Sequence, residues 1–124
     1  MILDASALLA YLQQEPGSSE VELILPTALI STVNWCEVAQ KLQARLIDDQ
    51  EILKNLKILG LQTIPFQLEH AKKAAELWQI TSTFGLSLED RACLATGIIE
   101  KIPVITADQV WKQLPLPLEI KLLR

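Results

Sequence analysis

The segment Arg91-Ala-Cys-Leu-Ala-Thr-Gly-Ile-Ile99 is apolar on nearly all sides and rich in small residues. A helix of this composition is usually central and packs closely against a sheet. The next apolar run, Val104-Ile-Thr106, is short enough to be a buried strand. A central helix that leads into a buried strand is the repeating unit of an α/β domain.

The same alternation continues over the rest of the chain. Further strands are predicted at Met1–Leu3, Leu29–Ser31 and Leu61–Pro65, with a half-exposed edge strand at Leu118–Leu122. Apolar spacing and end signals predict helices over Ser6–Gln13, Val21–Leu25, Val33–Leu46, Ile52–Leu59 and Leu68–Trp78. Strands that are separated by helices pair in parallel through right-handed crossovers. The sequence therefore predicts a three-layer α/β/α domain with a mainly parallel central sheet.

Length and composition bound the number of domains and the class of protein. A chain of 124 residues, 50% hydrophobic and 21% charged, has room for one hydrophobic core, so we expect one domain over residues 1–124. The first residues carry no basic segment, and Asp4 interrupts their apolar run, which argues against a signal peptide. The longest uncharged stretch, residues 23–36, is too short to span a bilayer. We expect a cytoplasmic protein.

Charge and ligand content narrow the functional classes. The net charge of −4 argues against a protein held on nucleic acid by bulk electrostatics, but not against an enzyme that meets a phosphodiester through a metal ion. A zinc site lacks ligands, because Cys36 and Cys93 are far apart and His70 is the only histidine. We expect both cysteines to be small buried hydrophobes and His70 to lie on the surface.

Four carboxylates stand where apolar runs give way to helix-start signals. Asp4 follows the first strand, Asp108 follows the fourth, and Asp90 opens the central helix. Glu37 lies about two turns beyond the second strand. Because ligands bind outside the carboxyl ends of the strands in an open parallel sheet, all four side chains can face one crevice.

Each carboxylate taken alone has a simpler role. Asp4 and Asp108 can cap the helix or turn that follows, and Ser87-Leu-Glu-Asp90 is a passable capping box. Glu37 can pair with Lys41 one turn further on. A good cap contributes about 1 kcal/mol.

The joint interpretation explains more than these single roles. Four like charges in one crevice need either shared protons or a divalent cation. A set of oxygen ligands without His or Cys suits Mg²⁺ or Mn²⁺. Such ions can activate a water for in-line attack on a phosphodiester. We therefore predict that Asp4, Glu37, Asp90 and Asp108 are both catalytic and metal-binding.

Neighbouring polar residues fit such a site. Ser6 and Thr106 each lie two residues from a carboxylate, where a hydroxyl either orients the carboxylate or satisfies nearby backbone. Glu89, next to Asp90, is expected to point elsewhere on the helix. Three nearby cations either receive a phosphate backbone or form a solvated face: Lys41, Arg45 and Arg91.

At these residues the chain resembles a known family. Met1-Ile-Leu-Asp-Ala-Ser6, Asn34-Trp-Cys-Glu37, Leu86-Ser-Leu-Glu-Asp90-Arg-Ala and Ile105-Thr-Ala-Asp108 resemble, in order and spacing, the motifs of PIN-domain nucleases. The likeness extends over essentially the whole chain and is strongest toward the VapC-type toxins of bacterial toxin–antitoxin pairs. One departure is Glu89, where family members often carry Gly or another small residue.

The resemblance implies an endoribonuclease, a hydrolase that depends on Mg²⁺ or Mn²⁺ and uses Asp4, Glu37, Asp90 and Asp108 as its acidic quartet. It also implies a homodimer, and inhibition by a small antitoxin protein whose C-terminal segment covers the site.

Three other functions fit the sequence less well. A phosphotransferase of the haloacid dehalogenase type needs a second Asp where this chain has Ser6. A response-regulator receiver needs an acidic pair at the first strand and a Lys after a late strand, and the chain has neither. The remaining alternative is a PIN-like module that binds RNA or a protein partner without cleavage. Four intact acids and the negative net charge disfavour it.

Overall fold

The sheet at the centre of the molecule has five short strands that all run parallel. The computed structural model describes residues 1–124 and gives the strand order β3-β2-β1-β4-β5. The strands are β1 (Ile2–Leu3), β2 (Leu29–Ser31), β3 (Gln62–Ile64), β4 (Val104–Thr106) and β5 (Ile120–Leu122). Leu3 lies opposite Ile30 on one side and Ile105 on the other. The predicted parallel sheet and the edge position of the last strand are confirmed.

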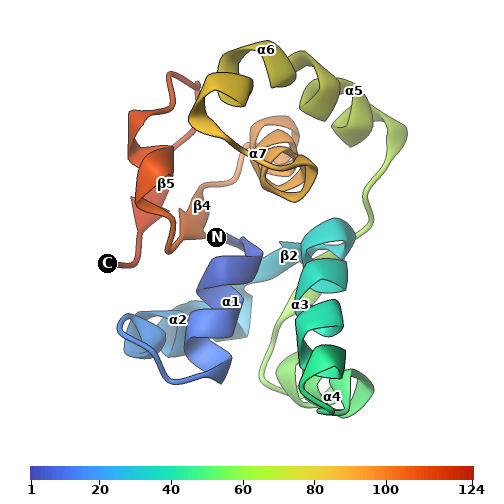
Figure 1. Cartoon of the computed structure of the whole chain (residues 1–124). Helices are drawn as coiled ribbons and strands as arrows, with labels where there is room; N and C mark the ends of the chain where they lie inside the picture. The colour runs from blue at the N-terminus through green and yellow to red at the C-terminus, as the bar shows by residue number, and fades with distance from the viewer.

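Helices cover both faces of this sheet. They are α1 (Ala5–Leu12), α2 (Ser18–Ile24), α3 (Thr32–Ala44), α4 (Asp49–Ile58), α5 (Leu68–Glu76), α6 (Trp78–Thr81) and α7 (Leu88–Glu100). Three short 3₁₀ turns complete the chain: η1 (Leu25–Thr27), η2 (Ser82–Phe84) and η3 (Gln109–Gln113). Figure 1 shows α1–α4 on one side of the strands and α5–α7 on the other. The predicted three-layer α/β/α architecture is confirmed.

The central helix α7 packs closely on the sheet, as its small residues predict. Its segment from Ala92 to Gly97 is buried. A Cβ atom on Gly97 would lie 2.7 Å from Cγ1 of Val104, so any larger residue here would force the helix, the strand or the Val104 side chain to shift. One apolar cluster fills the space between the sheet and α5, α7 and η3, and a second lies beneath α1–α4.

The helix predicted over residues 68–78 is divided in two. It ends at Glu76, and the short α6 follows after Leu77. The carbonyl oxygen of Ala74, which a continuous helix would pair with Trp78, accepts a 2.8 Å hydrogen bond from Arg91 of α7. A cation at this end is also favourable for the helix dipole of α5.

The strand order reverses at the middle of the sheet. The chain runs outward from β1 through β2 to β3 and then returns to place β4 on the other side of β1. At such a reversal the connections leave the strand ends in opposite directions, and a ligand site lies between them. The junction of β1 and β4 is therefore the position at which functional side chains are expected.

No helix here combines the length and hydrophobicity that a membrane crossing requires.

Two expectations about side-chain burial are wrong. His70 is only 2% exposed, because its face of α5 packs against α7. Its Nδ1 accepts the Gln67 backbone N–H at 2.9 Å, its Nε2 lies 2.9 Å from Glu100, and its ring stacks on Phe66. Cys93 is buried as predicted, whereas Cys36 is exposed on α3, where it lines a hollow together with Glu37.

Candidate active site

Asp4 is the most deeply buried carboxylate of the candidate site, with 4% of its surface exposed. It caps α1, since its Oδ1 accepts the Ala7 N–H at 2.8 Å. Hydroxyls of Ser6 and Thr106 donate to the same carboxylate at 2.8 and 2.5 Å. Burial raises the pKa of Asp4 to about 6 even though these hydrogen bonds lower it. No Lys or Arg forms a salt bridge with it.

The hydroxyls of Ser6 and Thr106 join the ends of β1 and β4. Ser6 accepts the Ala107 N–H at 2.9 Å, and Thr106 accepts the Asp108 N–H at 3.0 Å. Asp108 in turn accepts the Val110 N–H at 3.0 Å and caps η3. Both hydroxyls therefore orient Asp4 and also satisfy nearby backbone, the two roles that the sequence left open.

Asp90 enters the site at the start of α7. It forms the predicted capping box with Ser87: its Oδ2 accepts the Ser87 N–H at 2.9 Å, and its own N–H bonds the Ser87 hydroxyl at 3.1 Å. Burial is the main cause of the raised pKa of Asp90, and the negative charges of Asp108 and Glu89 raise it further.

Glu37 enters from α3, on the opposite side of the crevice. Its pKa is raised by partial burial, while Lys41, 3.6 Å away, lowers it. The charges of Asp90 and Glu89 raise it further. The predicted pairing of Glu37 with Lys41 is confirmed, and the same carboxylate faces the acids of α7.

The charges of the four acids affect one another's pKa values. Asp90 raises the pKa values of Asp4 and Glu37, and Asp108 raises that of Asp90. Cys93 lies within the same field: burial raises its pKa first, and the charges of Asp4, Asp90 and Glu37 add to that effect. Asp90 is therefore the central member of the group.

The donor chemistry of this group suits a divalent cation. No three of the four carboxylates bring oxygens within 4.8 Å of one another, as expected for like charges that repel. Burial disfavours the charged forms of Asp4, Glu37 and Asp90. Lys41 is the one cation that forms a salt bridge with any of the four acids. All the ligands are oxygens, the set that hard ions such as Mg²⁺ and Mn²⁺ prefer.

The three candidate phosphate-binding cations are not brought together. Lys41 lines a hollow beside Glu37. Arg45 lies at the far end of α3, where it lines a separate hollow with Leu12 and Glu15. The Arg91 guanidinium points to α5, where it binds the Ala74 carbonyl.

Two residues near the carboxylates were not assigned a site role from the sequence. Glu89 was expected to point elsewhere, but it lines the same hollow as Glu37 and raises the pKa values of Glu37 and Asp90. Asn34 is buried and donates a hydrogen bond from Nδ2 to the backbone carbonyl of Glu89 at 3.0 Å. The available signal for Asn34 was its position three residues before Glu37, on the same face of α3.

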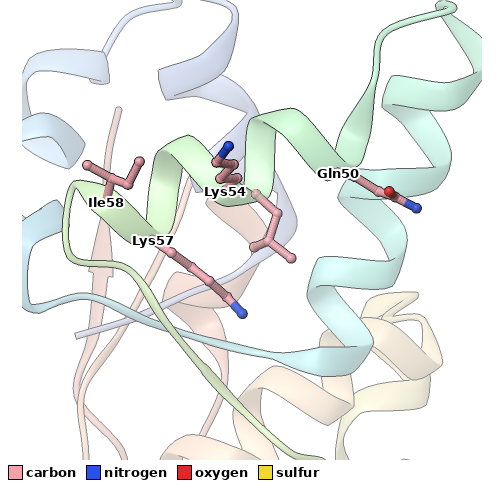
Figure 2. A pocket seen from close by; sticks show the side chains of 5 residues that line it. Gln50, Lys54, Lys57 and Ile58 are labelled. Atoms are coloured by element: carbon pink, nitrogen blue, oxygen red, sulfur yellow. The ribbon is translucent and has the colours of Figure 1, made fainter.

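Other hollows and clusters do not match this chemistry. A hollow on the outer face of α4 is lined by Gln50, Leu53, Lys54, Lys57 and Ile58, and contains no carboxylate (Figure 2). Glu69, His70 and Glu100 bring ligand atoms within 4.8 Å of one another. However, Nδ1 of His70 accepts a backbone N–H, so Nε2 of the neutral ring carries the proton and donates it to Glu100. That nitrogen has no lone pair for a metal.

A comparison with protein families agrees with this arrangement. The model of the family described as PIN domain matches residues 1–116. A search among curated proteins found no significant match.

Several solved structures share the fold over nearly the whole chain. A toxin–antitoxin complex from Klebsiella pneumoniae has 22% identity and a TM-score of 0.74, covering 96% of this chain and 98% of its own. DNA-bound VapBC from Salmonella typhimurium has 12% identity and a TM-score of 0.75, covering 99% and 97%. VapBC2 from Rickettsia felis, in a complex with a DNA fragment from the VapBC2 promoter, has 19% identity and a TM-score of 0.71. The match covers 97% of this chain and 96% of the Rickettsia chain.

Proposed function

This chain belongs to the PIN domain family, and we propose that it is a metal-dependent endoribonuclease that hydrolyses RNA phosphodiester bonds. One observation carries the proposal. Four carboxylates from four different parts of the chain are linked by mutual charge effects, three of them have raised pKa values, and a single lysine is their only cationic partner. Such a group is poorly suited to stability alone, because the acids repel one another and burial disfavours the charged forms of three of them.

We propose that Asp4, Glu37, Asp90 and Asp108 hold one or two Mg²⁺ or Mn²⁺ ions. A bound divalent ion lowers the pKa of water and stabilises negative charge on phosphodiester oxygens. The family match supports divalent metal use in general, and the oxygen-only donors support these two ions.

The chain's own residues supply orientation and charge. Ser6 and Thr106 hold both oxygens of Asp4 in place, so its carboxylate stays directed at the crevice. The Ser87 capping box holds Asp90 in the same way. Of the three candidate cations, Lys41 remains as the one to contact the RNA phosphate backbone, since it lies beside Glu37.

We further propose that the protein is the toxin of a type II toxin–antitoxin pair, acts in the cytoplasm, forms a homodimer and is inhibited by a small antitoxin. The fold shared with toxin–antitoxin complexes supports this partner. Large apolar side chains are exposed on α2–α4 and the turns beside them, among them Leu23, Leu46 and Ile58. Apolar surface of this kind is typical of protein–protein contacts.

Cleavage of RNA by the purified protein tests the activity. We expect structured RNA to be cut in Mg²⁺ or Mn²⁺ but not in EDTA, and the Asp90→Asn variant to fold normally and lose cleavage. Full cleavage by that variant would refute the assignment. RNA binding by the wild type without any cleavage would favour the alternative, a PIN-like module that binds without cutting.

A further inference from the structure

We propose that Asn34 is a positioning residue that fixes the Glu37 carboxylate relative to Asp90. The inference rests on the proposed metal-dependent nuclease. It concerns how α3 and α7, which carry Glu37 and Asp90, are held in position relative to each other.

Asn34 links the helix that carries Glu37 to the segment that carries Asp90. It lies in the first turn of α3, one turn before Glu37 on the same face. Its Nδ2 donates a 3.0 Å hydrogen bond to the carbonyl oxygen of Glu89, the residue directly before Asp90. A single side chain therefore joins the helix that carries one acid to the backbone that carries the other.

The other polar contacts of the first turn of α3 go elsewhere. Ser31 caps the helix by accepting the Val33 N–H, and Thr32 accepts the Phe66 N–H from the loop after β3. These contacts fix the start of α3 on its own side of the sheet. Asn34 supplies the side-chain hydrogen bond that connects α3 with α7.

The burial of Asn34 is difficult to explain by folding alone. Its surface is 1% exposed, and its Oδ1 is buried without a hydrogen-bond partner. A buried amide with an unsatisfied oxygen is destabilising, and a leucine of similar size would avoid that penalty. Without the amide, the Glu89 carbonyl could still accept a backbone hydrogen bond within α7. Placement of the acids gives the amide a role that an apolar residue cannot perform.

Mn²⁺ binding to the folded protein tests this role. Free Mn²⁺ is measured by electron paramagnetic resonance during titration of the wild type and of Asn34→Leu. We expect the variant to bind Mn²⁺ about tenfold more weakly, the usual effect of removing a contact that orients a metal ligand. Its melting temperature in EDTA should not fall. Asn55→Leu, at an exposed position of α4, is the matched control and should bind as the wild type does.

A double-mutant cycle separates positioning from a general structural effect. If Asn34 acts through Glu37, then Asn34→Leu should change Mn²⁺ affinity by less than about twofold in a Glu37→Gln background. If Asn34→Leu does not fold, Asn34→Ala enters the same cycle. Equal Mn²⁺ affinity of the wild type and the Asn34 variant would overturn this inference alone. Absence of both Mn²⁺ binding and RNA cleavage in the wild type would overturn the proposed function, and this inference with it.

Discussion

The hydroxyl of Thr106 donates a 2.5 Å hydrogen bond to Oδ2 of Asp4, joining residues that are 102 positions apart. The hydroxyl oxygen of Thr106 also accepts the backbone N–H of Asp108 at 3.0 Å. One neutral side chain at the end of β4 therefore connects the carboxylate of Asp4 with the backbone of Asp108. Because a hydrogen bond to a carboxylate favours its charged form, Thr106 opposes the burial that raises the pKa of Asp4.

Replacement of this hydroxyl should raise the pKa of Asp4 further. In Thr106→Val the carboxylate loses a donor, so we expect its pKa to exceed the value of about 6. The Asp108 N–H also loses its acceptor, which should cost about 1–3 kcal/mol of unfolding free energy. Carboxyl ¹³C NMR in EDTA measures the pKa, and urea unfolding measures the stability.

The matched control for this change is Thr96→Val. Thr96 is also buried, but its hydroxyl donates to the Ala92 carbonyl within α7, away from Asp4. This variant should leave the pKa of Asp4 unchanged. An Asp4 pKa in Thr106→Val at or below that of the wild type would contradict the role given to the hydrogen bond.

Asp4 should make the metal-free protein less stable as pH rises. Its pKa increases from 3.8 to about 6 on folding, so between these values the folded state keeps a proton that the unfolded state releases. The stabilising contribution is complete below pH 4 and lost above pH 6, a change of about 3 kcal/mol. Urea unfolding at pH 4 and pH 7.5 in EDTA measures it. Asp4→Asn should remove the contribution of Asp4 to the difference in unfolding free energy between these pH values. If the variant kept the pH dependence of the wild type, Asp4 would not be its source.

Glu89 should restrain activity. Its charge raises the pKa values of Glu37 and Asp90 and lies beside the hollow that a phosphate backbone would approach. Glu89→Gln should therefore lower the KM for RNA about twofold to fivefold, with a larger effect at low salt. The acidic limb of the pH–rate profile should move to lower pH. The control Glu51→Gln, at an exposed position of α4, should change neither the KM nor the pH–rate profile. A raised KM for Glu89→Gln would show that Glu89 favours RNA binding instead of opposing it.

Local sequence signals were sufficient for most of the fold. The bounds of Leu29–Ser31 and Val104–Thr106 were predicted and observed without change, because strands buried on both faces leave uninterrupted apolar runs. Caps at Asp4 and Asp90 are also local, since they depend on residues one turn away. The strand order is not local, and it is the order that places β4 beside β1 and gathers the acids.

Side-chain orientation on the helices was harder to predict than the helices themselves. His70 has charged neighbours in sequence, and only the packing of α5 on α7 shows that it is buried. The direction of Glu89 and the contact of Asn34 likewise depend on how α3 and α7 face each other. Such tertiary relationships override local pattern. For Asn34 the sequence offers only its spacing from Glu37, and for the burial of His70 and the direction of Glu89 it offers no readable signal.

His70 should contribute to stability and not to catalysis. His70→Leu keeps the side-chain volume but leaves the Gln67 N–H and the Glu100 carboxylate without their partner. We expect a loss of about 1–3 kcal/mol in the free energy of unfolding, measured in urea. Mn²⁺ affinity and RNA cleavage at 25 °C should be unchanged. Glu100→Gln keeps an acceptor for the ring N–H, so it should lose less unfolding free energy than His70→Leu does. Reduced Mn²⁺ affinity in His70→Leu would contradict a purely structural role.

Gly97 should couple the packing of α7 to the position of Asp90. In an open helix, Gly→Ala would stabilise by about 1 kcal/mol. Here the added Cβ would lie 2.7 Å from Val104 Cγ1 and 3.1 Å from the Ile102 carbonyl, so α7 must move away from β4. We expect Gly97→Ala to destabilise by about 1–3 kcal/mol and to reduce cleavage, because Asp90 moves with its helix. Adding Val104→Ala to the Gly97→Ala variant should relieve the clash and restore part of the cleavage. A gain in stability for Gly97→Ala alone would show that the sheet yields instead of the helix.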